Sequence, residues 1–175
     1  MAGMAGTAGL RVALGCGMIV LCVGCRSTSP TALNVTVQVD RALAGQSVQV
    51  DLVGVSEADS SVMKGCPVSE YFRPDNALRK SLDRASVLFG TRGTSVLNLR
   101  CTEPIWKRWL ASGSAQLFVL ADIPGVASDD ARRFCLPLAH DRWRRGFRSS
   151  WRSTSVQIIV DGARVRCLTP PRPPK

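Results

Sequence analysis

Short runs in which apolar and polar residues alternate are the feature that most constrains the fold of this chain. Two such runs cover 33–39 and 48–52. The apolar residues that share one face are Leu33, Val35, Val37 and Val39 in the first run and Val48, Val50 and Leu52 in the second. A period of two is that of a β-strand, whose successive side chains point to opposite faces. Both runs therefore predict half-buried strands.

Five further segments are predicted as strands: 96–101, 115–121, 133–138, 155–160 and 163–167. The segment 115–121 is almost wholly apolar, so we place it in the middle of a sheet. Pro137 cannot donate a ladder hydrogen bond, which moves 133–138 toward an edge or a bulge. Asp161-Gly162 separates the last two segments, and this pair predicts a hairpin with a type I′ turn.

Two segments between the strands have helical features. The segment 74–83 begins at a proline and carries Leu78 and Leu82 four residues apart. The segment 102–111 has a potential N-cap at Thr102, a proline in its first turn and Gly113 as a possible end. About seven strands and one or two helices predict a mostly β protein, an antiparallel β-sandwich with one or two short inserted helices.

The first part of the chain reads as an export signal. Residues 12–23 follow Arg11 and carry no charge. This uncharged run has the length of the apolar core of a signal peptide and is too short for a membrane-spanning helix. The run ends in Val23-Gly24-Cys25, which resembles the lipobox of bacterial lipoproteins. We therefore predict a lipoprotein signal peptide over 1–24 and cleavage before Cys25, which would then carry the lipid.

The predicted mature chain divides into three parts. Residues 25–32 form a lipidated polar tether, 33–168 form the sandwich, and 169–175 form a proline-rich tail that favours an extended conformation. Buried acyl chains contribute roughly 0.8 kcal/mol per CH₂, so the lipid would hold the protein on a membrane. Arg26 after the lipidated cysteine favours the outer membrane, facing the periplasm, under the rule known from enteric lipoproteins.

Four cysteines remain after the leader and the lipidated residue are set aside: Cys66, Cys101, Cys135 and Cys167. An even number in an exported chain predicts disulfides, and three connectivities are possible. One plausible pattern joins 101 with 135 and 66 with 167. A zinc site is disfavoured, because no two cysteines have the short spacing of zinc ligands and His140 is the only histidine.

The chain is strongly basic, with 23 Lys and Arg against 13 Asp and Glu and a formal charge of +10. One segment, 140–152, combines arginines with aromatics; its candidate binding residues are Arg142, Trp143, Arg144, Arg145, Arg148, Trp151 and Arg152. In an exported lipoprotein this segment favours anionic lipid, cell-wall polymer or an acidic protein over nucleic acid. The alternative is that its aromatics cover one end of the sandwich while the arginines are solvated.

Catalysis is poorly supported by the sequence. It contains no nucleophile elbow, no glycine-rich phosphate loop and no zinc-protease motif. His140-Asp141 is the only pair that resembles an acid–base apparatus, and Asp129-Asp130 is as typical of a turn or helix start as of a cation site. We expect no catalytic residue, no metal and no cofactor. Trp106 and Trp109 are expected to pack their helix onto a sheet.

A lipobox, a short tether and a β-sandwich with inserted helices together resemble the outer-membrane lipoprotein of type VI secretion systems, over 33–165. The matching features are a strand over 48–52, aromatic residues over 70–72 with Leu78, an apolar strand over 116–121, and Trp143-Arg144. The resemblance implies a non-enzymatic anchor that grips the periplasmic end of an inner-membrane partner through loops. The main hypothesis is thus an envelope lipoprotein that binds a protein partner, and the alternative is one that binds anionic polymer or lipid.

Overall fold

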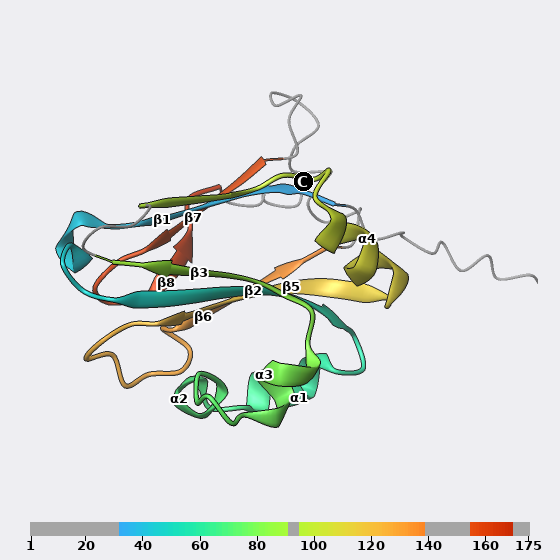
Figure 1. The fold of residues 1–175 in the computed structure, drawn as a ribbon, viewed down its shortest axis with the longest axis horizontal. Coiled ribbons are helices and arrows are strands. Elements are labelled where there is room, and N and C mark those ends of the chain that lie inside the picture. The colour runs from blue at the N-terminus through green and yellow to red at the C-terminus, as the bar shows by residue number, and fades with distance from the viewer. Residues whose placement is uncertain (1–31, 91–94, 139–154, 170–175) are drawn as a thin grey trace, which may run out of the picture.

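The computed structural model describes residues 32–90, 95–138 and 155–169 (Figure 1). The predicted signal peptide 1–24, the lipidation site Cys25 and all but the first residue of the tail 169–175 lie outside these residues. No helix within the described residues is long and apolar enough to cross a membrane.

The described residues form two four-stranded sheets stacked on one another. The first has the strand order β4-β1-β7-β8 and the second β3-β2-β5-β6. Their bounds are β1 Asn34–Val39, β4 Val96–Leu99, β7 Ser155–Val160 and β8 Val165–Cys167 in the first sheet, and β2 Val48–Ser56, β3 Arg84–Phe89, β5 Ser114–Asp122 and β6 Arg133–Pro137 in the second. The predicted mostly β sandwich is confirmed.

The main core lies between the two sheets and is built by the alternating residues that the sequence singled out. Val35 and Val37 from β1 and Val48, Val50 and Leu52 from β2 are 1% exposed or less. Burial of this kind contributes about 25 cal/mol per Å² of apolar surface. The second sheet is apolar on both faces, because Val53, Val55 and Phe118 belong to a separate buried cluster on its outer side.

Three short helices cover that outer side: α1 Ser60–Gly65, α2 Val68–Tyr71 and α3 Ala77–Ser81 (Figure 1). They place Met63, Val68 and Tyr71 in the outer cluster. A further helix, α4 Pro104–Ala111, connects β4 with β5 at one end of the sandwich, and a 3-10 turn, η1 Arg41–Leu43, connects β1 with β2 at the other. The described residues therefore form three layers: the helices α1 to α3, the β3-β2-β5-β6 sheet in the middle, and the β4-β1-β7-β8 sheet on the far side.

Among the described residues, the sandwich is closed along one side and open along the other. At the start of β8, the Val165 N–H donates to the carbonyl oxygen of Ala131, just before β6, at 2.7 Å. Since β8 and β6 are the last strands of their sheets, β4 and β3 lie together along the opposite side. No element within the described ranges joins β4 to β3 there.

The strand predictions agree closely with the structure, with one omission. All seven predicted strands are present, 115–121 lies in the interior of its sheet and 133–138 lies at an edge. The strand β3 was missed, because the exposed residue Leu88 is apolar like its inward-facing neighbours Val87 and Phe89. The run therefore does not alternate cleanly between apolar and polar residues.

Two strand predictions need correction. The sandwich is not wholly antiparallel, since β1 pairs with β7 in parallel. The hairpin of β7 and β8 has a four-residue connection, because Val160 pairs with Val165. Asp161 Oδ1 accepts from the Ala163 and Arg164 N–H groups at 2.8 Å, and Gly162 has no positive φ as a type I′ turn would need.

The helix predictions are partly confirmed. Helix 102–111 is present but begins at Pro104 after Glu103, so Thr102 is not its N-cap. Gly113 follows its end with φ +76°. Helix 74–83 shrinks to α3, with the Asn76 side chain accepting from the Arg79 N–H at 2.7 Å. The helices α1 and α2 were missed, because helices this short have no intrinsic stability and form only through packing.

Candidate functional site

The basic–aromatic segment lies outside the described residues. Its candidate binding residues Arg142, Trp143, Arg144, Arg145, Arg148, Trp151 and Arg152, together with His140 and Asp141, all fall within 139–154. The described residues carry 13 Lys and Arg and 12 Asp and Glu, a formal charge of only +1 against +10 for the whole chain. Almost all of the excess positive charge therefore belongs to residues outside the described ones, and five arginines are in this one segment.

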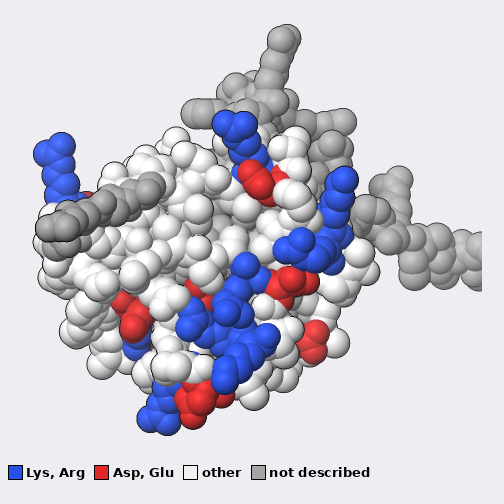
Figure 2. Space-filling view, viewed as in Figure 1, with Lys and Arg blue, Asp and Glu red and all other residues white. Residues whose placement is uncertain are grey.

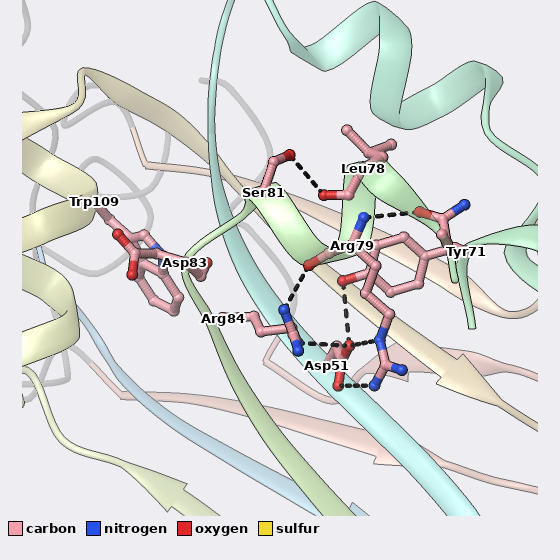
Figure 3. Close-up of polar contacts among 9 residues, drawn as sticks. Asp51, Tyr71, Leu78, Arg79, Ser81, Asp83, Arg84 and Trp109 are labelled. Atoms are coloured by element: carbon pink, nitrogen blue, oxygen red, sulfur yellow. Dashed lines mark hydrogen bonds and ion pairs between the residues drawn. The ribbon is translucent and has the colours of Figure 1, made fainter. Parts of the chain in front are cut away.

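Within the described residues, a buried carboxylate gathers the largest polar cluster. Asp51 lies in the middle of β2 on the face that the helices cover, and it is 0% exposed. Its Oδ2 accepts from the Tyr71 hydroxyl at 3.2 Å and from Arg79 Nε at 2.8 Å. Arg84 Nε is 3.7 Å from the same oxygen. Figure 3 shows these three side chains converging on Asp51 from α2, α3 and β3. We call this set the Asp51 cluster.

The residues of the Asp51 cluster are also tied to one another. Arg79 lies over the Tyr71 and Phe72 rings, with Cζ 5.8 Å and 5.2 Å from their centroids. Arg84 Nη1 donates to the Arg79 carbonyl oxygen at the end of α3. The hydrogen bond to Asp51 raises the pKa of Arg79, and burial together with the negative charge of Asp51 raises the pKa of Tyr71. The partners of Asp51 come from α2, α3 and β3, so the cluster fastens these helices to the sheet.

A basic surface lies above this cluster. Lys80 is exposed next to Arg79, and Arg108 pairs with Asp83 at 3.0 Å in the open. Figure 2 shows Lys and Arg side chains gathered over α3 and the start of β3, with acidic side chains between them. Such exposed pairs contribute little to stability, but the surface can favour a partner of opposite charge.

The two tryptophans of α4 pack as the sequence predicted. Trp106 and Trp109 are each 1% exposed and meet edge to face, with their centroids 5.1 Å apart. Trp109 Nε1 donates to the Asp83 carbonyl oxygen at 2.8 Å. Its ring lies so close to β2 that a Cβ on Gly54 would come within 2.4 Å of it. These rings are core residues and are not available for stacking on a ligand.

All four cysteines of the sandwich are free thiols in the structure. The pattern 101–135 with 66–167 does not fit its geometry. Cys101 follows β4 and Cys135 is in β6, in different sheets and on opposite sides of the sandwich. Cys66 and Cys167 are separated by the whole β3-β2-β5-β6 sheet. Bridging requires Cα atoms within about 7 Å. The structure therefore does not support the pairing of 101 with 135 and of 66 with 167.

Burial raises the pKa of three of these thiols, those of Cys66, Cys135 and Cys167. A raised pKa keeps a thiol protonated at neutral pH, and the protonated form is a poor nucleophile. The Cys135 thiol donates to Gln116 Oε1 at 3.0 Å. None of these three cysteines therefore has the activated environment of a catalytic thiol.

Two polar residues near α1 and α2 have structural roles. Asp129 Oδ1 accepts from the Val68 N–H at 2.8 Å, so it satisfies a free donor at the start of α2 from a distant loop. Arg133 lies against the end of α1, where its guanidinium donates to the carbonyl oxygens of Met63, Lys64 and Cys66. No group of three or more possible metal ligands occurs among the described residues. The role of Arg133 had no signal in the sequence, because its partners are about 70 residues away.

No protein-family model and no curated protein matches the sequence at a significant level. Solved structures do match the fold. One is Lip from Serratia marcescens, a membrane-bound component of the type VI secretion system, with 14% identity, a TM-score of 0.51, and 79% of this chain and 98% of that chain covered. Another is a chain in the structure of the C-terminal domain of the type VI secretion protein TssM from EAEC, also with 14% identity and a TM-score of 0.51, covering 78% and 99% of the two chains.

At this level of identity the comparisons establish the fold. The architecture of the sandwich is that of proteins from type VI secretion membrane complexes, as the sequence resemblance implied.

Proposed function

We propose that this chain is a lipid-anchored, non-catalytic component of the cell envelope that binds a protein partner within a secretion apparatus. The observation that carries the proposal is the fold similarity to Lip, a membrane-bound component of such a system, across 98% of that chain. The lipobox-like sequence at Cys25 supports the membrane anchor independently.

The partner is proposed to be the periplasmic end of an inner-membrane protein. The chain itself would be held by the lipid at Cys25, on the outer membrane facing the periplasm. The first strand, β1, begins only a few residues beyond the end of the polar tether, so the sandwich would lie close to the membrane surface. A short tether of this kind limits the reach of the domain and so favours a fixed position in an assembly.

Mass spectrometry of the intact protein and its peptides from the native envelope, without reduction, tests the anchor. We expect an acylated Cys25 at the N-terminus and no residues 1–24. The same spectra show whether Cys66, Cys101, Cys135 and Cys167 are free or paired. An unprocessed chain would contradict the lipoprotein assignment.

Crosslinking in intact cells, followed by purification of the chain, tests the partner. The proposal expects an inner-membrane protein of a secretion system to be recovered with the acylated chain. It expects that protein to be absent when Cys25→Ser prevents anchoring. Recovery of soluble periplasmic proteins alone would contradict the proposed place in a membrane complex.

A second candidate function is binding of anionic lipid or envelope polymer through residues 142–152. Two observations favour it. The segment holds much of the positive charge that the sandwich lacks. The nearest described residues on either side of it, Leu138 and Ser155, lie at the α4 end of the sandwich. There the Leu138 N–H donates to the Ala115 carbonyl oxygen, and Ser155 pairs with Asn34 at the start of β1. Both described ends of the gap that holds the segment are therefore at the end of the sandwich where the predicted tether, residues 25–32, joins the domain.

Vesicle flotation tests this second function. Arginine near an anionic surface contributes about 1 kcal/mol, so changing Arg144, Arg145 and Arg148 to Ser should weaken binding to phosphatidylglycerol vesicles by roughly a hundredfold. Binding to phosphatidylcholine vesicles should not change, and added salt should reduce the difference. Equal binding of the variant and the unaltered protein to anionic vesicles would reject it.

A further inference from the structure

The four edge strands of the sandwich differ in how well they are protected against pairing with another chain. Natural proteins protect edges by keeping strands short or by placing charges and prolines on them. β4 and β8 are only four and three residues long. β6 carries Arg133 and Pro137. β3 is six residues long, and after Arg84 it contains neither a charge nor a proline. It is the least protected edge among the described strands.

The open side of the sandwich lies along this same strand. Ala85 and Val87 of β3 point toward the main core but are only half-buried, and so is Leu97 of β4. On the other face of β3, Leu88 is 61% exposed, the highest value among the large apolar side chains of the described residues. We call Ala85, Val87, Leu88 and Leu97 the β3 seam. An added strand would bury apolar side chains on both of its faces.

The charges beside the seam have a positive excess, although the exposed Asp83, which pairs with Arg108, directly precedes Arg84. Arg84 begins β3, and Lys80 is exposed at the end of α3 just before it. Arg79 and Arg84 share the single carboxylate of Asp51, so the corner keeps a positive excess. Figure 2 shows this gathering of basic side chains where α3 meets β3. An approaching segment would be stabilised by acidic residues at this end.

We propose that the β3 seam is the docking surface for an extended, acidic segment of the protein partner, which adds to the second sheet as a strand. Its alternate apolar side chains would cover Ala85, Val87 and Leu97, and its backbone would pair with the free edge of β3. Its acidic residues would lie near Lys80 and Arg84. A second copy of this chain is a poorer occupant, because two strongly basic chains repel each other. The inference rests on the proposed function and specifies where the partner binds.

A synthetic peptide tests the seam without the natural partner. The probe is an acetylated twelve-residue peptide that alternates Val with Glu or Thr, and the control peptide has the same length with prolines at its two central positions. Both are added to the full chain in mild detergent, and hydrogen exchange is followed by mass spectrometry. We expect the first peptide to slow exchange in the segment containing β3, and the proline peptide to leave it unchanged.

Variants of the chain locate the binding. Leu88→Lys places a charge on the edge and should weaken peptide binding by about tenfold or more, which corresponds to about 1.4 kcal/mol. Val62→Lys is the matched control, because Val62 is 56% exposed on α1, away from the seam. The affinity of this variant for the peptide should stay within about twofold of that of the unaltered chain. Lys80→Glu should weaken binding of the acidic peptide and leave that of a peptide with Thr in place of Glu unchanged.

Three results would overturn the inference. The peptide could fail to bind, it could protect a segment other than β3, or it could bind Leu88→Lys as well as the unaltered chain. Slowed exchange of β3 on raising the chain concentration without peptide would assign the seam to a second copy instead. Failure here is distinct from failure of the proposed function. If Leu88→Lys still recovers the inner-membrane protein in cells, the partner stands and the seam is rejected.

Discussion

Asp51 shows how a single residue joins two layers of this protein. It lies in an alternating strand that the sequence predicts, on the face opposite to Val50 and Leu52, and the helices cover that face in the structure. Its charge is balanced by two arginines and a tyrosine that are 20 to 33 positions further along the chain. A buried carboxylate is costly unless it is paired and hydrogen-bonded. Asp51 therefore requires the helices α2 and α3 to lie over β2.

Asp51→Asn tests this role. Removing one charge of a buried pair leaves the other uncompensated, so we expect the free energy of unfolding to fall by about 3–5 kcal/mol. Asp83→Asn is the control, because the pair of Asp83 with Arg108 is exposed and contributes less than about 1 kcal/mol. Urea unfolding followed by circular dichroism measures both. A similar loss in the two variants would contradict the role of Asp51.

Tyr71 is the only tyrosine of the chain, so its ionisation can be followed directly by absorbance at alkaline pH. Burial and the nearby Asp51 raise its pKa above the ordinary value of 10.0. In the pH range above 10 the unfolded state loses this proton while the folded state keeps it. The free energy of unfolding should therefore fall as the pH rises through this range. Titration of folded protein with an ordinary tyrosine pKa would show that Tyr71 is not buried as described.

At the scale of elements, the helix layer is the part that the sequence defined least well. α1 and α2 are six and four residues long, and neither has a side-chain N-cap of its own. Their ends are satisfied instead by Arg133 from β6 and Asp129 from the preceding loop. Strands 33–39 and 115–121 were predictable because their side-chain pattern is local. The helix layer was not, because the groups that stabilise it come from distant positions.

Arg133→Met tests the dependence of α1 on β6. The methionine keeps most of the apolar stem but cannot donate to the three carbonyl oxygens. Leaving them without partners should lower the free energy of unfolding by about 1–3 kcal/mol. It should also speed amide exchange in α1. Arg73→Met is the matched control, because Arg73 forms only an exposed pair with Glu70 at 3.0 Å. Unchanged exchange in α1 would mean that the helix is held by its apolar contacts alone.

At the scale of the whole molecule, charge and fold are separated. The described residues carry a formal charge of +1, and the residues outside them supply the other nine charges. The described residues therefore form a nearly neutral domain with an apolar core, and the strongly basic segments of the chain lie outside the described residues. Long-range attraction to an anionic surface would come from those segments, whereas the fold would be stabilised without them.

Changing all five arginines of 142–152 to Ser tests this separation. The formal charge from Cys25 onward falls from +9 to +4. We expect the variant to elute from a cation exchanger at a clearly lower salt concentration. Its Tm should change by less than about 4 °C, which corresponds to about 1 kcal/mol or less for a domain of this size. A large loss of Tm would show instead that these arginines are part of the folded sandwich.

The sequence by itself determined the strands with clean alternation, the two-sheet architecture and the burial of Trp106 and Trp109, because each depends on side-chain periodicity over a few residues. It also supplies the predicted export signal, lipidation site and basic segment, which lie outside the described residues. Only the tertiary structure decided the parallel pairing of β1 with β7, the position of β3 at an open edge, the Asp51 cluster and the separation of Cys101 from Cys135 and of Cys66 from Cys167. These features depend on which distant segments meet, and the energies that select them arise only when the sheets and helices pack together.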